Sequence, residues 1–269
     1  MDRIGLAATV VGVLAVAGLA APAGAQTGMM QHVDLSSPKM SEAELSRADV
    51  IALLEAATPD QPANLADLGL NGLDLSGLDL SGADFSRSRL NRVNLKGAVL
   101  EGATLDLAWL IEADLENVDL RGASMIQTQL IKARLAGADL SGARVVANFE
   151  GAMLEDAKLT NASMAPDMKN QSMGLMRTVF RSAVLDRADL SGTDLAWSDM
   201  EFSKVRNAVL VDVDFENARL GGIDLTGSDV RGMNVAGANL ASAKLRQLTG
   251  EDEIRGLDQA INLKRAFRK

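Results

Sequence analysis

Residues 73–105 read LDLSGLDLSGADFSRSRLNRVNLKGAVLEGATL. A large apolar residue recurs in this stretch at every fifth position, as at Leu75, Leu80 and Phe85, and the residue two places earlier is usually small. A period of five matches neither the 3.6 residues of a helical turn nor the two residues of a strand. A short, fixed repeat over much of a chain is typical of a solenoid, in which stacked coils share one continuous core.

The repeat extends over about residues 63–247 in three blocks. It keeps one frame over 65–145, is shifted by one residue over 149–164, and returns to the first frame over 175–245. The residues between the second and third blocks, 165–174, do not follow the period, and we expect a bulge or a loop there.

The corner position, two residues after each central apolar residue, indicates how many repeats close one coil. Glycine recurs there at twenty-residue spacing in two columns, which are Gly82, Gly102, Gly122 and Gly142, and Gly77, Gly97, Asn117 and Gly137. Four five-residue sides therefore make one coil. We expect a positive φ at these two corners of the four, because glycine adopts it without steric cost.

Several repeats have the form Ala-Asp/Asn-Leu-x-Gly or its first three residues, namely Ala83-Asp84-Phe85, Ala113-Asp114-Leu115, 138–142, 188–192 and Ala238-Asn239-Leu240. With this pattern the chain resembles the pentapeptide-repeat family over residues 63–247. The resemblance implies an all-β fold, a right-handed quadrilateral parallel β-helix. The shift at 145–149 and the break at 165–174 depart from the family pattern.

The segments flanking the repeat are predicted to cover its ends, since a solenoid end exposes apolar core and unpaired strand edges. Residues 26–40 are expected to be a flexible linker and 41–62 an N-terminal cap. Ser41 and Glu44 have the spacing of a capping box, which predicts a short helix over about 42–57. Residues 248–269 lose the period and are expected to form a C-terminal cap, so that short helical caps close both ends.

Residues 1–25 have the features of a secretory signal peptide. Arg3 is followed by an apolar run over 4–19, and Ala23-Gly24-Ala25 has the small residues of a cleavage site. We expect cleavage before Gln26 and a periplasmic or secreted protein. The alternative is that the segment stays as a membrane anchor, since residues 4–25 could just span a bilayer.

Composition argues against an enzyme. The 269-residue chain has no cysteine, which excludes disulfides and zinc–thiolate sites, and its one histidine, His32, lies in the expected linker. Its carboxylates, such as Asp74 and Asp79, recur at an outward position where Asx side chains bond the backbone of turns. No nucleophile cluster, phosphate loop or metal-ligand spacing occurs. We therefore predict a non-enzymatic protein without a cofactor.

Exposed aromatic residues on a polar solenoid suggest a contact surface. Trp197 and Phe202 fall at outward positions five residues apart, and Trp109 falls at another outward position. We predict that the protein is a binding or structural scaffold and that these residues contact a protein partner in the cell envelope. The alternative is that they lie over a neighbouring side chain or loop.

Methionines offer a second possible function. Met164, Met168, Met173 and Met176 surround the irregular segment, and thioether ligands select Cu(I). A copper-binding periplasmic protein is therefore an alternative. Methionine also fills irregular gaps in cores, and Met164 itself falls on an axial position.

The net charge of −9 raises a third possibility. Some members of the family that the chain resembles imitate duplex DNA in shape and charge and bind DNA gyrase. A signal peptide argues against this role, because gyrase works in the cytoplasm. Outward arginines also interrupt the negative faces: Arg87, Arg89, Arg92, Arg134 and Arg144. The acidic charge disfavours direct binding of nucleic acid.

Overall fold

The computed structural model describes residues 33–58, 60–167 and 176–268. The predicted signal peptide over 1–25 and most of the predicted linker lie outside the described residues. The chain divides into two units, Met1–Val33 and Asp34–Lys269, and the second contains all the coils. No helix in the described part of the chain is long and apolar enough to cross a membrane.

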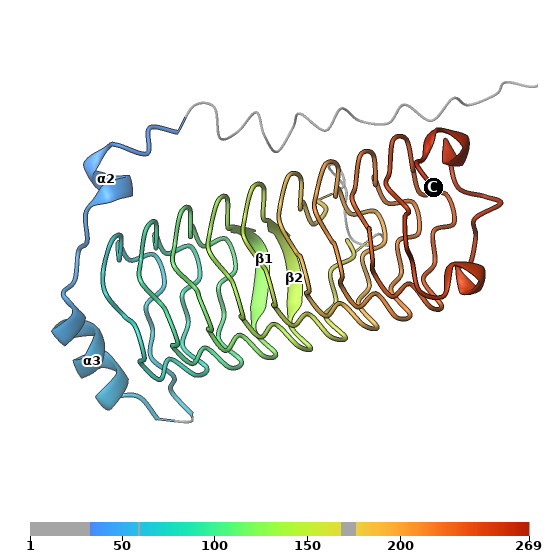
Figure 1. Cartoon of the computed structure of the whole chain (residues 1–269). Helices are drawn as coiled ribbons and strands as arrows, with labels where there is room; N and C mark the ends of the chain where they lie inside the picture. The colour runs from blue at the N-terminus through green and yellow to red at the C-terminus, as the bar shows by residue number, and fades with distance from the viewer. Residues whose placement is uncertain (1–32, 59, 168–175, 269) are drawn as a thin grey trace, which may run out of the picture. The chain divides into compact units, whose positions relative to one another are not determined.

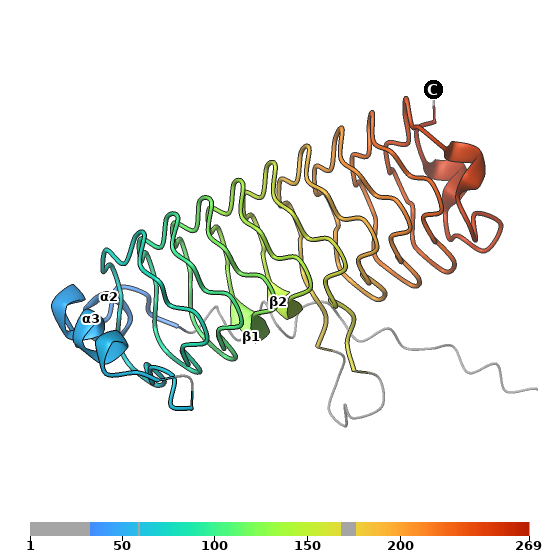
Figure 2. The ribbon, with the colours of Figure 1, turned by 90° about the horizontal axis from the view of Figure 1, so that it is seen from below.

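The repeat folds into stacked coils, seen from the side in Figure 1 and from below in Figure 2. Parallel bridges join residues twenty apart on four sides of the coil. The first bridge on each side is Asn64–Asp84, Gly69–Arg89, Asp74–Asn94 and Asp79–Val99, and these define sides A, B, C and D in that order. Each coil is therefore four-sided, as the spacing of the corner glycines predicts.

The apolar core runs along the axis of the stack. The central residue of each side, such as Leu75, Leu80 and Phe85, is fully buried. The small residue two places earlier, such as Ala83, is also buried and lets the wall approach the axis. Each buried leucine contributes on the order of 2 kcal/mol of hydrophobic stabilisation.

All four corners adopt the left-handed conformation, so the expectation that only two do was wrong. Arg87, Arg92, Leu107 and Glu112 have φ of 60°, 55°, 62° and 58°, close to the 66° of Gly82. The same turn recurs along the coils. For example, the amide of Ala83 donates to the carbonyl of Leu80 around the corner residue Gly82. A type II turn needs positive φ at its third residue whatever that residue is.

The one-residue frame shift removes a corner. Strand β1 (Ser124–Gln129) pairs in parallel with β2 (Arg144–Asn148), and the register shifts between Ile126 and Gln129. Gln127 has a positive φ of 60°, whereas no residue of β2 does. The chain is therefore straighter at this corner, and the following bridges, such as Arg134–Met153, join residues nineteen apart.

The irregular segment is an insertion within one coil. Bridges such as Asn148–Val179 span 31 residues, and the twenty-residue register resumes with Val179–Asp199. The extra residues fall at the predicted break, 165–174, of which 168–174 lie outside the described part. The core continues past the insertion, since the rings of Phe149 and Phe180 stack with their centroids 4.6 Å apart.

Among the described residues, two short helices precede the first coil: α2 (Pro38–Ser41) and α3 (Arg47–Glu55). The predicted helix exists but is shorter than 42–57, and the expected capping box of Ser41 and Glu44 was wrong. Ser46 and Asp49 form the box. The Glu44 side chain instead binds the first coil, where it accepts a hydrogen bond from the amide of Gly69.

These N-terminal residues cover the first coil. Ala43 bridges antiparallel to Leu70, which occupies the free strand edge of side B. Val50 of α3 is fully buried in the core, and Arg47 donates to the carbonyls of Asp74 and Ser76. Covering the edge in this way leaves it unable to pair with another chain.

At the C-terminal end the coil continues. Thr249, Arg255, Ile261 and Phe267 bridge to residues 20, 21, 22 and 23 places earlier, so that each side is longer than the last. The 3-10 turns η1 (Glu251–Glu253) and η2 (Leu263–Arg265) supply residues for this widening. The segment predicted as a C-terminal cap, 248–269, thus keeps the parallel pairing and carries two short 3-10 helices, and its Ile254 and Leu257 pack against the core.

Candidate partner-contact site

Trp197 and Phe202 lie at the two ends of one side. They are successive corners of a single coil, with φ of 64° and 63°, and residues 198–201 of side B run between them. Phe202 is 65% exposed, and Trp197 is half-buried. The repeat thus presents the two aromatic residues of the sequence prediction at opposite edges of the same short surface.

A network of ion pairs fills the surface between these corners. Arg181, from the preceding coil, approaches Asp199 at 2.8 Å and Glu201 at 3.3 Å. Arg219, from the following coil, approaches the same carboxylates at 3.5 and 3.2 Å. The Asp199 side chain is only 3% exposed, and its hydrogen bond raises the pKa of Arg181. Two carboxylates are therefore held rigidly between two guanidinium groups.

Arg177 adds a third guanidinium to this side. It precedes Val179 by two residues, as Trp197 precedes Asp199, so the Val179–Asp199 bridge puts Arg177 in register with Trp197 of the adjoining coil, although Arg177 lacks the left-handed φ of that corner. Arg177 is half-buried and makes no hydrogen bond or ion pair with any residue that the structure describes. Burial lowers the pKa of Arg177, and the charge of Arg219 lowers it further.

Sequence reasoning missed the charged members of the site. The pairs Arg181–Asp199 and Arg219–Glu201 join residues eighteen apart, on adjacent coils. All four residues lie after the insertion, so a table of this block in rows of twenty places them close together. The spacing of eighteen between opposite charges is therefore the signal that could have found them in the sequence.

Trp109 lies on a different coil from Trp197 and Phe202. It lies on side B between Arg89 and Gln129 and is half-buried. Four coil spacings separate it from Asp199 along that side, a distance of roughly 19 Å. Its neighbour Leu107 is a corner residue with 42% exposure. The structure therefore does not bring Trp109 together with Trp197 and Phe202.

The predicted methionine site is only partly described. Met164 is fully buried on the axis and packs in the core. Met176 is half-buried, and Met168 and Met173 lie outside the described residues. The described coils hold no group of three His, Cys, Asp or Glu side chains arranged for a metal ion. Copper binding stays a prediction.

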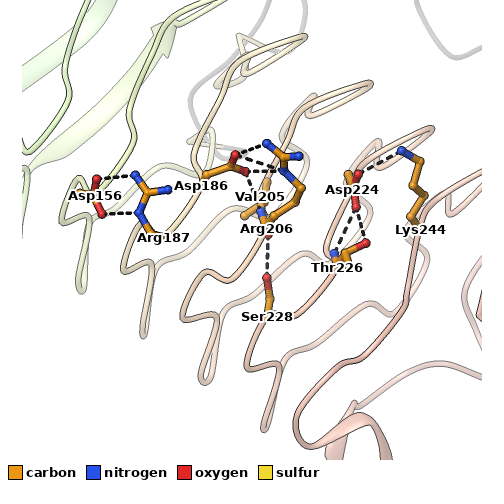
Figure 3. Close-up of polar contacts among 9 residues, drawn as sticks. All are labelled: Asp156, Asp186, Arg187, Val205, Arg206, Asp224, Thr226, Ser228 and Lys244. Carbon is orange, nitrogen blue, oxygen red and sulfur yellow. Dashed lines mark hydrogen bonds and ion pairs between the residues drawn. The ribbon is translucent and has the colours of Figure 1, made fainter.

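Side C and its corners carry ion pairs between neighbouring coils (Figure 3). Asp156 pairs with Arg187 at 2.6 Å, and Lys244 pairs with Asp224 at 3.0 Å. Asp186 binds the guanidinium of Arg206 and also accepts a hydrogen bond from its amide. Acidic and basic groups alternate here, so the negative charge is compensated locally.

The family model for pentapeptide repeats matches eight copies in this chain, at residues 63–106, 108–145, 175–201, 195–232 and 208–247, which is more than half of its length. The chain belongs to the pentapeptide-repeat family. The parallel coils of this pentapeptide-repeat protein are accordingly a right-handed β-helix solenoid. No curated protein gives a significant match.

Solved structures similar to this pentapeptide-repeat protein include three relatives in different settings. HetL from the cyanobacterium Nostoc sp., involved in heterocyst differentiation regulation, is 26% identical over 83% of this chain and 95% of its own, with a TM-score of 0.35. QnrB1, a plasmid-mediated fluoroquinolone resistance protein, is 16% identical over 75% and 90%, with a TM-score of 0.32. A thylakoid-lumen protein of Arabidopsis thaliana is 26% identical over 46% and 69%, with a TM-score of 0.17.

Proposed function

We propose that this protein is an exported, non-enzymatic scaffold that binds a protein partner through side B between Trp197 and Phe202. The observation that carries the proposal is the exposure of Phe202, 65%, at the edge of an ordered network of ion pairs. Aromatic and arginine side chains dominate the binding energy of protein interfaces. Side B combines both in the space of a few residues.

Rigidity supports a role in display. The backbone bonds to the coil before and the coil after, as when Phe202 donates to the carbonyl of Gly221 and Lys204 donates to that of Ala183. The arginines of the site are already held by Asp199 and Glu201. A surface ordered before binding loses little conformational entropy when a partner docks.

The outward carboxylates have structural uses, which fits a protein without catalysis. Asp74 accepts a hydrogen bond from the amide of Ser76, and Asp79 accepts one from that of Ser81. These are the local turn bonds expected from the sequence. Other carboxylates, such as Glu101 and Glu116, pair with arginines of neighbouring coils.

The location of the protein is the part of the proposal that rests on residues 1–25 alone. Cell fractionation followed by sequencing of the mature N-terminus tests it. A chain that begins at Gln26 in the periplasm or medium supports export. An intact Met1 in the membrane indicates an anchored scaffold, and an intact Met1 in the cytoplasm overturns export.

Site-specific photocrosslinking in the native cell tests the contact surface. A photoreactive phenylalanine analogue at position 202 or 197 should give a discrete adduct with one protein. The matched control is position 107, where Leu107 is another exposed apolar corner, on a distant coil. Phe202→Ala should abolish co-purification of that protein, whereas Leu107→Ala should not. Equal adducts from position 107, or none from 197 and 202, would overturn the proposal.

The two alternative functions make different predictions. A copper protein should take up Cu(I) in a way that Met168→Leu with Met173→Leu abolishes. A DNA mimic should inhibit gyrase as the mature protein. The local compensation of charge by pairs such as Asp186–Arg206 and Asp224–Lys244 disfavours the second role, because a mimic of duplex DNA needs a continuous negative surface.

A further inference from the structure

One guanidinium group of side B pairs with no carboxylate of the described residues. Asp199 and Glu201 are each shared between Arg181 and Arg219. Arg177 makes no ion pair with any described residue, although it lies close enough to this cluster for Asp199 and Arg219 to act on its charge.

The position of Arg177 is unfavourable in the free protein. Half-burial removes part of its hydration, and Arg219 is a like charge, while the smaller attraction of Asp199 does not offset these two effects. Both effects lower the pKa of Arg177, yet an arginine side chain stays protonated near neutral pH. An anion beside Arg177 would compensate for the lost hydration and for the repulsion by Arg219. Binding an anion should therefore stabilise Arg177 more than it stabilises a fully solvated arginine.

We propose that Arg177 receives a carboxylate from an acidic segment of the protein partner, at the edge of the site that Trp197 marks. This inference rests on the proposed function and specifies the chemistry of the partner. A planar guanidinium binds a carboxylate through two parallel hydrogen bonds. Trp197 and Phe202 offer apolar surface for the rest of the segment.

The test uses Trp197 as its own reporter. The chain has two tryptophans, so Trp109→Phe leaves Trp197 as the only one. The mature protein with this change is titrated with a capped tetraglutamate peptide, and Trp197 fluorescence is followed. We expect a saturable change that weakens as salt is added, and no change with capped tetraglutamine or tetralysine. Arg177→Gln should weaken binding by about tenfold or more, the usual effect of losing a charged hydrogen bond.

Arg187→Gln is the matched control. It removes the same unit of charge from an exposed arginine that pairs with Asp156 on another corner. Circular dichroism verifies that both variants stay folded. The inference is overturned if the peptide does not bind, if Arg187→Gln weakens binding as much as Arg177→Gln, or if tetraglutamine binds equally well.

Failure of this inference can be told apart from failure of the proposed function. Crosslinking from position 202 that persists in Arg177→Gln, with normal co-purification of the partner, supports the scaffold and overturns the carboxylate contact. A single-stranded oligonucleotide that binds more tightly than tetraglutamate, with the same dependence on Arg177, overturns both the choice of partner and the protein-scaffold role of side B.

Discussion

The aromatic ring of Phe202 occupies the space that a side chain at Gly222 would need. A β-carbon built on Gly222 would lie 2.6 Å from Cδ1 and 2.8 Å from Cε1 of the ring. The two residues are corners of adjacent coils. The same relationship recurs at Asn117 and Gly137, where the added carbon would lie 2.4 Å from the Asn117 side-chain oxygen. A large corner side chain therefore leans over a glycine one coil further on.

Gly222→Ala should destabilise the protein and displace the Phe202 ring. The left-handed φ of 68° costs an alanine about 1–2 kcal/mol, and the contact with the ring adds to this. Gly102→Ala is the control, because Gly102 has a φ of 66° and no atom within 4 Å of an added β-carbon. Urea unfolding should show the larger loss for Gly222→Ala, and Phe202→Ala should remove the difference. Equal losses in the two variants would contradict this packing.

Ser198→Ala should leave the stability unchanged or raise it. The Ser198 hydroxyl is buried without a hydrogen-bond partner in the described structure, so removing it breaks no hydrogen bond. Ser228 occupies a comparable buried position but donates to the carbonyl of Val205 and accepts from the amide of Ala208. Ser228→Ala should therefore cost about 1–3 kcal/mol. The free energies of unfolding of both variants check this, and similar losses would show that Ser198 has a partner.

The pairing of Asp186 and Arg206 should make stability depend on pH (Figure 3). Burial raises the pKa of Asp186, but bonds from the side chain and amide of Arg206 outweigh this and hold it below the ordinary 3.8. The stabilisation from this pair is thus fully present above about pH 4 and is lost as the pH falls through the lowered pKa.

Asp186→Asn tests that pH dependence. The variant should be less stable than the wild type at pH 7 by about 1–3 kcal/mol. The difference should shrink as the pH falls through the lowered pKa of Asp186, where the wild-type carboxylate becomes protonated. Urea unfolding at pH 7, 4, 3 and 2 measures it. A difference that stays constant across this range would show that the loss comes from packing and not from the charge.

Phe180→Ala should uncouple the coils on either side of the insertion. Phe180 is fully buried and stacks on Phe149. Replacing such a buried ring by alanine should lower the free energy of unfolding by about 3–5 kcal/mol. Trp109 lies before the insertion and Trp197 after it. Two variants that each keep one tryptophan report on the two halves of the stack by fluorescence. With Phe180 present, both should unfold at the same urea concentration. With Phe180→Ala, the two should unfold at different urea concentrations. Coincident transitions in both backgrounds would show that other contacts carry the coupling.

The local signals at the N-terminal end show why boundaries are hard to predict. Ser41–Glu44 and Ser46–Asp49 both have the spacing of a capping box. Only the second pair forms one, because Glu44 binds the amide of Gly69 and the side chain of Arg89. These partners are 25 and 45 residues away, so no short window of sequence contains them.

The corners show a similar limit. Glycine marks only some of the positions with positive φ, since Arg87, Leu107 and Glu112 adopt the same conformation without it. A residue with a β-carbon has a steric cost at positive φ. The hydrogen bonds of the turn and those to the adjacent coil compensate for this cost by holding the backbone in place. Composition therefore revealed the period of the corners but not their full set.

The sequence by itself determined the axial residues, the four-sided coil, the frame shift and the position of the insertion, because each is a matter of spacing along the chain. It also pointed to Trp197 and Phe202 as corner residues. Only the tertiary structure decided that Arg181 and Arg219 meet Asp199 and Glu201, and that Arg177 stands beside them without a carboxylate. The twenty-residue register of these coils follows from spacing, but which guanidinium group reaches which carboxylate depends on the directions of side chains on adjoining coils, which only the folded structure decides.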